Sequence, residues 1–132
     1  MGAVVLDSSV VIALFDPEDA HHETAAATAR QLRAEGATMI APATVLAEVL
    51  VGSARQGTAA VAQRRAVMAA AFGRPRPIDE DIAVAAAHLR ARQPALRLPD
   101  ALVIATGIVD DAAVLTADKR WANIDPRIQL IG

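Results

Sequence analysis

Short apolar runs alternate along the chain with longer stretches in which apolar residues recur at helical spacing. The continuous runs at 3–6, 38–41 and 113–116 are typical of strands covered on both faces, and 128–131 (IQLI) predicts a weaker fourth strand. Strands separated by helices require right-handed crossovers, which build a parallel sheet. The pattern therefore predicts an α/β fold with three α/β/α layers around a central, mainly parallel sheet.

Helices are expected in the intervening segments because of their apolar periodicity and their terminal residues. A serine suits the start of the first helix, a proline suits the first turn of the last, and glycines suit several ends. Pro75 and Pro77 limit the segment RPRPI to at most a short edge strand, since proline has no N–H to donate. We expect helices after Ser8 or Ser9, over 18–35, from Pro42 or Thr44 to near Gly52, over 58–72, over 79–92 and from Leu98 onward.

Length and composition indicate a single domain over residues 1–132. Beside 32 alanines the chain has 39 larger apolar residues, about 30% of its length, which is enough for a core. The absence of cysteine excludes a disulfide framework, a thiolate metal site and a cysteine nucleophile, and it fits a cytoplasmic location. No apolar run approaches membrane-spanning length and no basic segment precedes the first strand, so we expect neither a membrane span nor a signal peptide.

Four carboxylates are predicted to share the edge of the sheet where the strands end. Asp7 directly follows the first strand, and Asp118 follows the strand at 113–116 by two residues. Asp100 lies in the first turn of its helix, and Glu48 lies one turn into another, both helices beginning at this same edge. In parallel α/β sheets, sites form at the carboxyl ends of the strands, so these acids are the candidate functional residues.

Each acid alone is also explained as a turn residue, a helix cap or a solvated flank. Four together, without matching cations, would repel one another and raise their pKa values. Mg²⁺ or Mn²⁺, which prefer oxygen ligands, would remove that repulsion, whereas zinc is disfavoured because cysteine and HxxxH spacing are absent. The residues by themselves leave a metal site and a structural set of acids as open alternatives.

Four segments carry a family resemblance when taken together: VLDSSVVIA at 5–13, PATVLAEVLVG at 42–52, LPDALVIATG at 98–107 and LTADKRW at 115–121. In this order and spacing they resemble the PIN domain, most closely the VapC-type toxins of bacterial toxin–antitoxin pairs. The resemblance implies a PIN-like fold and an endoribonuclease that inhibits translation and growth, with Mg²⁺ or Mn²⁺ as cofactor. It makes Asp7, Glu48, Asp100 and Asp118 the catalytic, metal-binding acids, supported by the hydroxyls of Ser9 and Thr116.

The same resemblance implies the partners. We expect a VapB-like antitoxin, an RNA substrate and a homodimer, with the helices over 18–35 and 58–72 as walls of the antitoxin groove. The net charge of −2 provides no general attraction for RNA. Local cations must then bind it, and Arg97, Lys119 and Arg120 are the candidates nearest the acids in the sequence.

Several other charged residues are interpreted as structural. His21 and His22 and the pair Arg64–Arg65 are expected on solvated helix faces, Asp79–Asp81 at a helix start, and Asp110–Asp111 in a turn.

Two other enzyme or signalling classes also place an Asp after the first strand. A haloacid-dehalogenase-type phosphatase needs a second Asp where Ser9 stands, and a receiver domain needs an acid pair and a third-strand Asp that are not evident here. The alternative that remains open is a receiver-like module or a catalytically inactive PIN-fold module that binds or signals.

Overall fold

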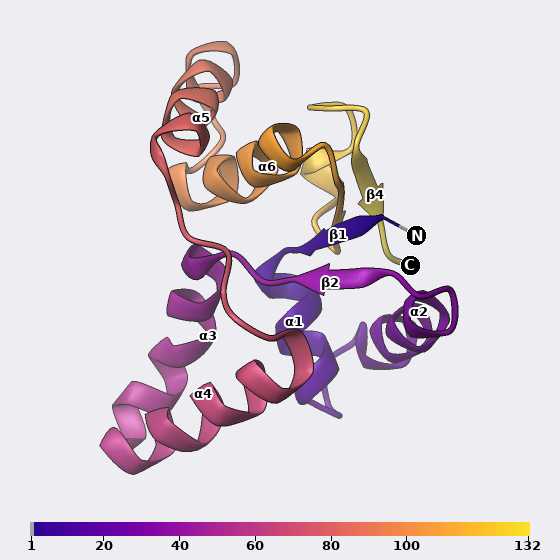
Figure 1. Ribbon diagram of the computed structural model, residues 1–132, viewed down its shortest axis with the longest axis vertical. Helices are drawn as coiled ribbons and strands as arrows, with labels where there is room; N and C mark the ends of the chain where they lie inside the picture. The colour runs from indigo at the N-terminus through magenta and orange to yellow at the C-terminus, as the bar shows by residue number, and fades with distance from the viewer. Residues whose placement is uncertain (1) are drawn as a thin grey trace.

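A computed structural model describes residues 2–132 of the chain. Its sheet has four parallel strands in the order β2-β1-β3-β4 (Figure 1). The strands are β1 (Ala3–Leu6), β2 (Thr38–Ile40), β3 (Ala113–Thr116) and β4 (Ile128–Leu130). The helices are α1 (Ser8–Phe15), α2 (His22–Ala34), α3 (Ala43–Gln56), α4 (Thr58–Phe72), α5 (Glu80–Arg92) and α6 (Leu98–Asp110), with a 3₁₀ turn η1 (Lys119–Trp121).

The helices lie on both faces of this sheet, so the predicted three-layer α/β/α fold is confirmed. α5 and α6 cover one face, α1 and α2 cover the other, and α3 and α4 form a helical hairpin that projects from the end of the sheet (Figure 1). Strands β1 and β3 lie at the centre, where Val5, Leu6 and Val114 are fully buried. Because all four strands run in the same direction, their carboxyl ends and the first turns of α1, α3 and α6 are brought to one edge.

Close packing of α6 on β3 fixes the height of that helix above the sheet. A Cβ atom on Gly107 would collide with the Val114 side chain and come within 3.0 Å of the carbonyl oxygen of Ala112. Only glycine therefore permits this separation. The close approach sets the position of Asp100, two turns earlier on the same helix.

Two predicted helix boundaries were wrong. The second helix begins at His22 rather than Glu18, because Asp16 and Asp19 accept hydrogen bonds from nearby backbone N–H groups and hold the preceding segment in turns. The helix that contains Glu48 continues through Gly52 to Gln56 and ends at Gly57, which has φ +118°. Glycine inside a helix costs only about 1 kcal/mol, and packing of α3 against α4 offsets that cost.

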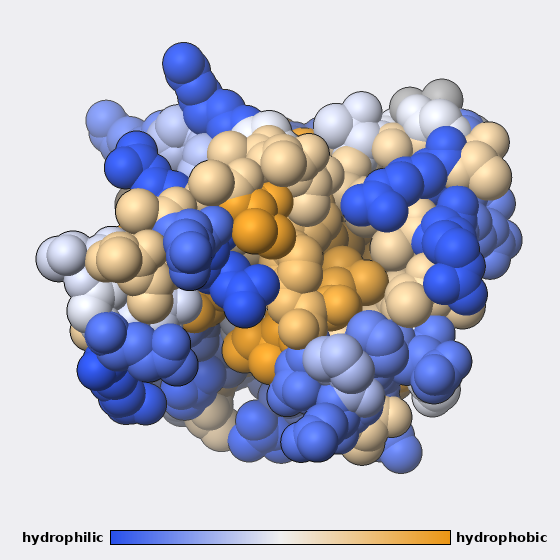
Figure 2. All heavy atoms as spheres, turned by 90° about the horizontal axis from the view of Figure 1, so that it is seen from below, coloured by the Kyte–Doolittle hydropathy of each residue, from blue (hydrophilic) through white to orange (hydrophobic). Residues whose placement is uncertain are grey.

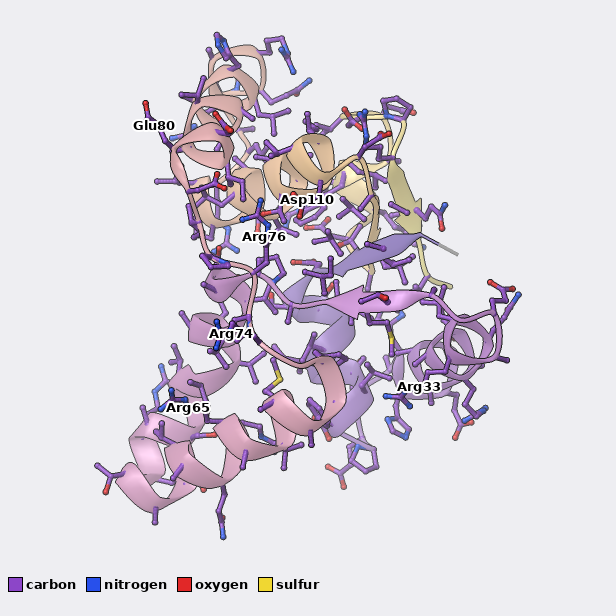
Figure 3. All side chains as sticks on the ribbon, viewed as in Figure 1. Arg33, Arg65, Arg74, Arg76, Glu80 and Asp110 are labelled. Carbon is purple, nitrogen blue, oxygen red and sulfur yellow. The ribbon has the colours of Figure 1, made fainter. Side chains whose placement is uncertain are left out.

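The segment with Pro75 and Pro77 lies beside Pro42, just past the carboxyl end of the edge strand β2. Arg76 forms a single β-bridge there: its N–H donates to Ala41 at 2.9 Å and its carbonyl oxygen accepts from Ala43 at 2.9 Å. Its guanidinium also forms two 2.9 Å bonds to Asp110, on the other side of the segment (Figure 3). The expected edge position is confirmed.

No helix within residues 2–132 combines the length and the apolarity needed to cross a bilayer.

Candidate active site

Asp7 is the innermost acid of the site. It is only 4% exposed, and as the residue between β1 and α1 it also caps α1 by accepting from the Ser8 N–H at 2.8 Å. Its Oδ2 accepts from the hydroxyls of Ser9 at 2.7 Å and Thr116 at 2.8 Å. These three residues, Asp7, Ser9 and Thr116, form what we call the Asp7 cluster. Neutral donors from two adjacent strand ends therefore hold this carboxylate in one orientation.

The Asp7 cluster also fixes the loop after β3. The Ser9 hydroxyl accepts from the N–H of Ala117 at 3.1 Å, and the Thr116 hydroxyl accepts from the N–H of Asp118 at 3.0 Å. Each hydroxyl thus links the first acid to the segment that carries the last. Their predicted position beside Asp7 and Asp118 is what the structure shows.

Burial dominates the electrostatics of Asp7. It raises the pKa of this carboxyl above its ordinary value of 3.8, against the opposing effect of the three hydrogen bonds, and Asp100 raises it further. Neutral donors only partly replace the lost hydration, so a cation would stabilise this carboxylate strongly.

Glu48 and Asp100 lie beside Asp7, each brought by its own helix. Burial raises the pKa of Glu48, and the nearby negative charges of Asp7 and Asp100 raise it further. Arg97 bridges the other two: its Nη2 lies 3.3 Å from Asp100 Oδ1 and 4.0 Å from Glu48 Oε2. The Arg97 side chain is 65% exposed, so a solvated cation, not a buried one, partly balances this pair.

One oxygen of Glu48 has no such partner. Its Oε1 is buried without a hydrogen-bond donor from any described residue, as is the hydroxyl of Thr44 one turn earlier on α3. Leaving a buried polar oxygen without a partner costs about 1–3 kcal/mol. An unpartnered carboxylate oxygen between two further carboxylates is the kind of donor set that a hard divalent cation satisfies.

Asp118 stands at the rim of the site in a different environment. It caps η1, and the guanidinium of Arg120 holds its carboxylate, with an Nη2–Oδ2 distance of 2.7 Å and an Nε–Oδ1 distance of 3.0 Å. These bonds lower the pKa of Asp118 below its ordinary value. The last of the four predicted acids is thus present at the same edge but paired with its own neighbour in the chain.

The four acids therefore converge without forming a ready cage. Within residues 2–132, no three carboxylate or imidazole side chains are grouped closely enough to enclose a metal ion. Asp100 is paired with Arg97, and Asp118 is paired with Arg120. The donor chemistry fits Mg²⁺ or Mn²⁺, and the assignment of these four residues as metal ligands stays a prediction.

The candidate RNA contacts lie where the sequence placed them, at this edge. Arg97 and Arg120 are paired with Asp100 and Asp118, and Lys119 is exposed beside Arg120 on η1. Both arginines are largely solvent-exposed, so their ion pairs are weak.

Some residues interpreted as solvated have definite contacts. The Nδ1 of His22 lies 2.7 Å from the carbonyl oxygen of Ala13 and ties α2 to α1, and the guanidinium of Arg64 lies 5.0 Å from the centre of the Phe15 ring. Asp79 caps α5 by accepting from the Ile82 N–H, as expected. These contacts are structural and lie outside the acidic site.

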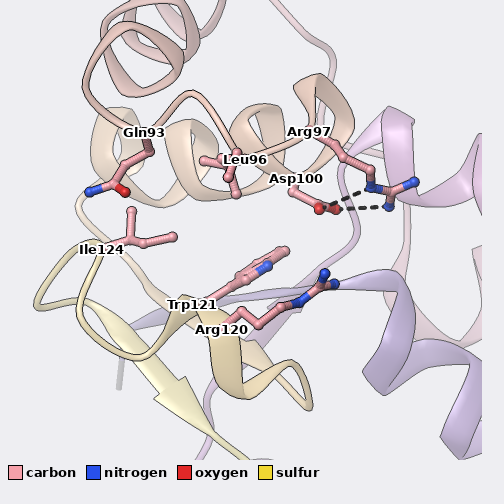
Figure 4. Close-up of a pocket in the computed structure, with 8 residues that line it drawn as sticks. Gln93, Leu96, Arg97, Asp100, Arg120, Trp121 and Ile124 are labelled. Atoms are coloured by element: carbon pink, nitrogen blue, oxygen red, sulfur yellow. Dashed lines mark hydrogen bonds and ion pairs between the residues drawn. The ribbon is translucent and has the colours of Figure 1, made fainter.

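Sequence reasoning missed a pocket that adjoins Asp100. Gln93, Leu96 and Ile124 line it together with Trp121 and Arg120 (Figure 4). None of the first three belongs to a recognisable motif, and they come from two separate segments of the chain. Only the fold places them beside the acids.

A second hollow lies on the far side of the molecule, between α1, α3 and α4. Figure 2, which views the molecule from below, shows an apolar patch bordered by hydrophilic residues on one face. Its two parts share polar lining residues, among them Gln56 and Arg64, and its apolar lining includes Ile12, Phe15, Val49 and Val67. Of the two helices expected to wall an antitoxin groove, the helix at 58–72 lines this hollow together with α3, whereas α2 contributes no lining residue, and the site of antitoxin binding stays a prediction.

Comparisons with known proteins agree with this architecture. A toxin–antitoxin complex from Klebsiella pneumoniae contains a chain 25% identical to this one, with a TM-score of 0.73 and coverage of 96% of this chain and 95% of that one. FitAcB from Neisseria gonorrhoeae gives 21% identity, a TM-score of 0.75 and coverage of 98% and 96%. The sarcin–ricin loop cleaving toxin VapC20 from Mycobacterium tuberculosis is 21% identical, with a TM-score of 0.69 and coverage of 90% of this chain and 92% of that one. No curated protein sequence matches.

The family model for the PIN domain matches residues 4–126, a range that contains all four acids and both supporting hydroxyls. This match confirms the PIN-domain resemblance carried by the four sequence segments. From the parallel sheet, the carboxylates at its edge and this match, we conclude that the chain belongs to the PIN domain family.

Proposed function

We propose that this protein is a Mg²⁺- or Mn²⁺-dependent endoribonuclease and the toxin of a VapBC-type toxin–antitoxin pair. The observation that carries the proposal is the convergence of Asp7, Glu48 and Asp100, with one buried Glu48 oxygen left unpartnered. The neighbours support it, because one is a sarcin–ricin loop cleaving toxin and another comes from a toxin–antitoxin complex.

In this proposal the chain's own residues have distinct tasks. The chemistry that a bound Mg²⁺ or Mn²⁺ supplies at such a site is the activation of water and the neutralisation of charge on the phosphate. Asp7, Glu48, Asp100 and Asp118 would hold the ion. Ser9 and Thr116 keep Asp7 oriented through their 2.7 and 2.8 Å hydrogen bonds, so little reorganisation is needed when substrate arrives.

The arginines would bind the RNA backbone. A guanidinium forms bidentate hydrogen bonds with phosphate as readily as with carboxylate. Arg97 and Arg120 pair with carboxylates in the described structure, so each would exchange a carboxylate for a phosphate when cation and RNA bind. This exchange overcomes the repulsion between an acidic site and an anionic substrate.

The proposal makes a specific statement about the products. Water activated at a carboxylate site attacks phosphorus without using the ribose 2′-hydroxyl, which leaves 5′-phosphate and 3′-hydroxyl ends. The test is end-group mapping of RNA after incubation with protein and Mn²⁺, with Asp7→Asn as the inactive control. Products with 2′,3′-cyclic phosphates, or equal cleavage by Asp7→Asn or in chelator, would contradict it. Absence of cleavage on every RNA supplied would favour the inactive binding module.

The groove between α1, α3 and α4 is our candidate for the antitoxin surface. Its apolar floor suits the apolar face of an amphipathic helix from a VapB-like partner. Val67→Glu on the exposed side of α4 should then weaken antitoxin binding without changing RNA cleavage. Val84→Glu, an exposed valine on α5, is the matched control.

The homodimer implied by the resemblance also stays a proposal. Light scattering at micromolar concentration tests it directly, and a monomer under those conditions would refute it.

A further inference from the structure

The pocket beside Asp100 has a volume of about 150 Å³ and lies between the end of α5, the start of α6 and the segment around η1 (Figure 4). It is distinct from the acidic site but continuous with it, because Asp100 and Arg97 form one of its walls. The proposed mechanism gives no task to its other residues, apart from Arg120: these are Gln93, Ala95, Leu96, Trp121 and Ile124.

The two ends of this pocket differ in chemistry. Arg97, Asp100 and Arg120 gather at one end (Figure 4). Leu96, Trp121 and Ile124 give the middle and the other end an apolar surface, and the Gln93 side chain lies at that apolar end. Gln93 is the exposed residue that caps the end of α5 through its backbone N–H, so its side-chain amide takes no part in capping the helix. The two arginines are paired with carboxylates, so this end suits a ligand whose anionic group exchanges with those carboxylates, and the other end suits a flat or apolar group with a polar edge.

A nucleotide has this distribution of charge. Its phosphate is matched by the two arginines, its base presents apolar faces, and the edge of the base carries both hydrogen-bond donors and acceptors. A glutamine amide offers both kinds of partner, and proteins recognise unpaired RNA bases by such edge contacts and by apolar stacking.

We propose that this pocket receives the base of one nucleotide flanking the cleaved phosphate, with Gln93 as a specificity-determining residue. The proposal deepens the proposed function and rests on it for the position of the phosphate. It follows that the RNA sequence preference is set by the ends of α5 and η1, outside the catalytic acids.

Trp121 makes the pocket directly observable. It is the only tryptophan in a chain without tyrosine, so its fluorescence reports on this site alone. The four nucleoside 5′-monophosphates are titrated into the protein in Mn²⁺ and the tryptophan emission is recorded. We expect a saturable change, with one base binding about tenfold more tightly than the weakest. Absence of saturation for all four would overturn the proposal.

Two variants separate base recognition from non-specific anion binding. Gln93→Leu should reduce the tenfold spread between bases to less than threefold, whereas Gln63→Leu, a matched change on exposed α4, should leave it unchanged. Ile124→Phe, which fills the apolar end without altering charge, should weaken all four nucleotides at least fivefold, with circular dichroism checking the fold. Equal spreads in Gln93→Leu and Gln63→Leu would overturn the role of Gln93.

Failure of this proposal is distinguishable from failure of the proposed function. The fluorescence titration needs no cleavage, so base-selective binding without RNA cleavage would refute the proposed nuclease activity and still support the base-binding pocket. Conversely, if cleavage is intact, sites cut by the native chain and by Gln93→Leu are mapped on one RNA pool. An unchanged preference for cleavage sites would support the nuclease activity and refute the role of the pocket in base recognition.

Discussion

The two sides of the acidic site are built on opposite principles. On the inner side, buried Asp7 is held by neutral hydroxyl and N–H donors that come from fixed positions at two strand ends. On the outer side, exposed guanidinium groups hold the acids: Arg97 pairs with Asp100, which is itself buried, and Arg120 pairs with Asp118 at the rim. The inner side is therefore organised before any ligand binds, whereas the outer side is charge-balanced by side chains that a ligand displaces.

This comparison explains why the pKa shifts of Asp7 and Asp118 have opposite directions. Burial without a cation raises the pKa of Asp7, and an adjacent cation lowers that of Asp118. In a site of this kind, a bound cation would stabilise the central carboxylate strongly and the carboxylate at the rim only weakly. The following predictions test that contrast.

The largest expected effect is on catalysis at the centre. Asp7→Asn should reduce RNA cleavage by more than about a hundredfold, since removing even a supporting partner of a metal ligand costs about 10–100-fold. Asp118→Asn should cost less than Asp7→Asn because Asp118 starts from a pairing with Arg120. Initial rates at saturating RNA and Mn²⁺ measure both. Equal losses would mean that the two sides act as one unit.

The hydroxyls of the Asp7 cluster should matter almost as much as a ligand. Thr116→Val keeps the shape of a fully buried side chain but removes one hydrogen bond to Asp7 and one from the Asp118 N–H. We expect about 10–100-fold lower activity and weaker Mn²⁺ affinity. Thr106→Val on α6, another fully buried threonine, is the control. The Asp7 cluster is not a supporting network if both variants behave alike.

Arg97 should compete with the cation on the outer side. Arg97→Ala frees Glu48 and Asp100, so Mn²⁺ binding measured by calorimetry should tighten about two- to fivefold, the range set by a weak exposed ion pair. Arg92→Ala, an exposed arginine on α5, should change nothing. Weaker Mn²⁺ binding by Arg97→Ala would show that Arg97 organises these acids rather than shielding them.

The smallest effect is on stability in chelator, and its sign differs between the two sides. Asp7 and Glu48 have folded-state pKa values raised above 3.8 and 4.5, so their contribution is most favourable below those values and is lost as pH rises through the folded values. Asp118, with a lowered pKa, contributes above 3.8 and loses that contribution as pH falls.

At pH 7 in chelator, Asp7→Asn should therefore raise the melting temperature and Asp118→Asn should lower it, each by a few degrees, since about 1 kcal/mol corresponds to roughly 2–8 °C for chains near this size. Thermal unfolding followed by circular dichroism measures both. A lower melting temperature for Asp7→Asn would show that its hydrogen bonds outweigh its burial.

The sequence predicted those features that depend on local chemistry and on the direction of the strands. The edge that gathers Asp7, Glu48, Asp100 and Asp118 follows from a parallel sheet, and the support of Asp7 by Ser9 and Thr116 follows from the family motifs. The helix through Gly52 was not predicted, because packing between α3 and α4 overrides a residue preference of about 1 kcal/mol.

Pairing within the site could not be read from the chain. Side-chain rotamers decide that Arg97 contacts Asp100 and Glu48 and that Arg120 turns back to Asp118, and sequence spacing does not specify rotamers. The pocket beside Asp100 could not be predicted from the sequence for another reason. Gln93, Leu96 and Ile124 carry no motif and meet only in three dimensions.

The single bridge of Arg76 just past the end of β2 bears on how copies of this chain assemble. An uncovered edge strand offers its backbone groups to the edge of another molecule, which is a route to aggregation. Here Arg76 occupies those groups at Ala41 and Ala43, and its neighbours Pro75 and Pro77 have no N–H with which to extend the ladder. Extension of the sheet past the carboxyl end of β2 is therefore blocked at Ala41 and Ala43, which disfavours strand pairing between molecules at this point.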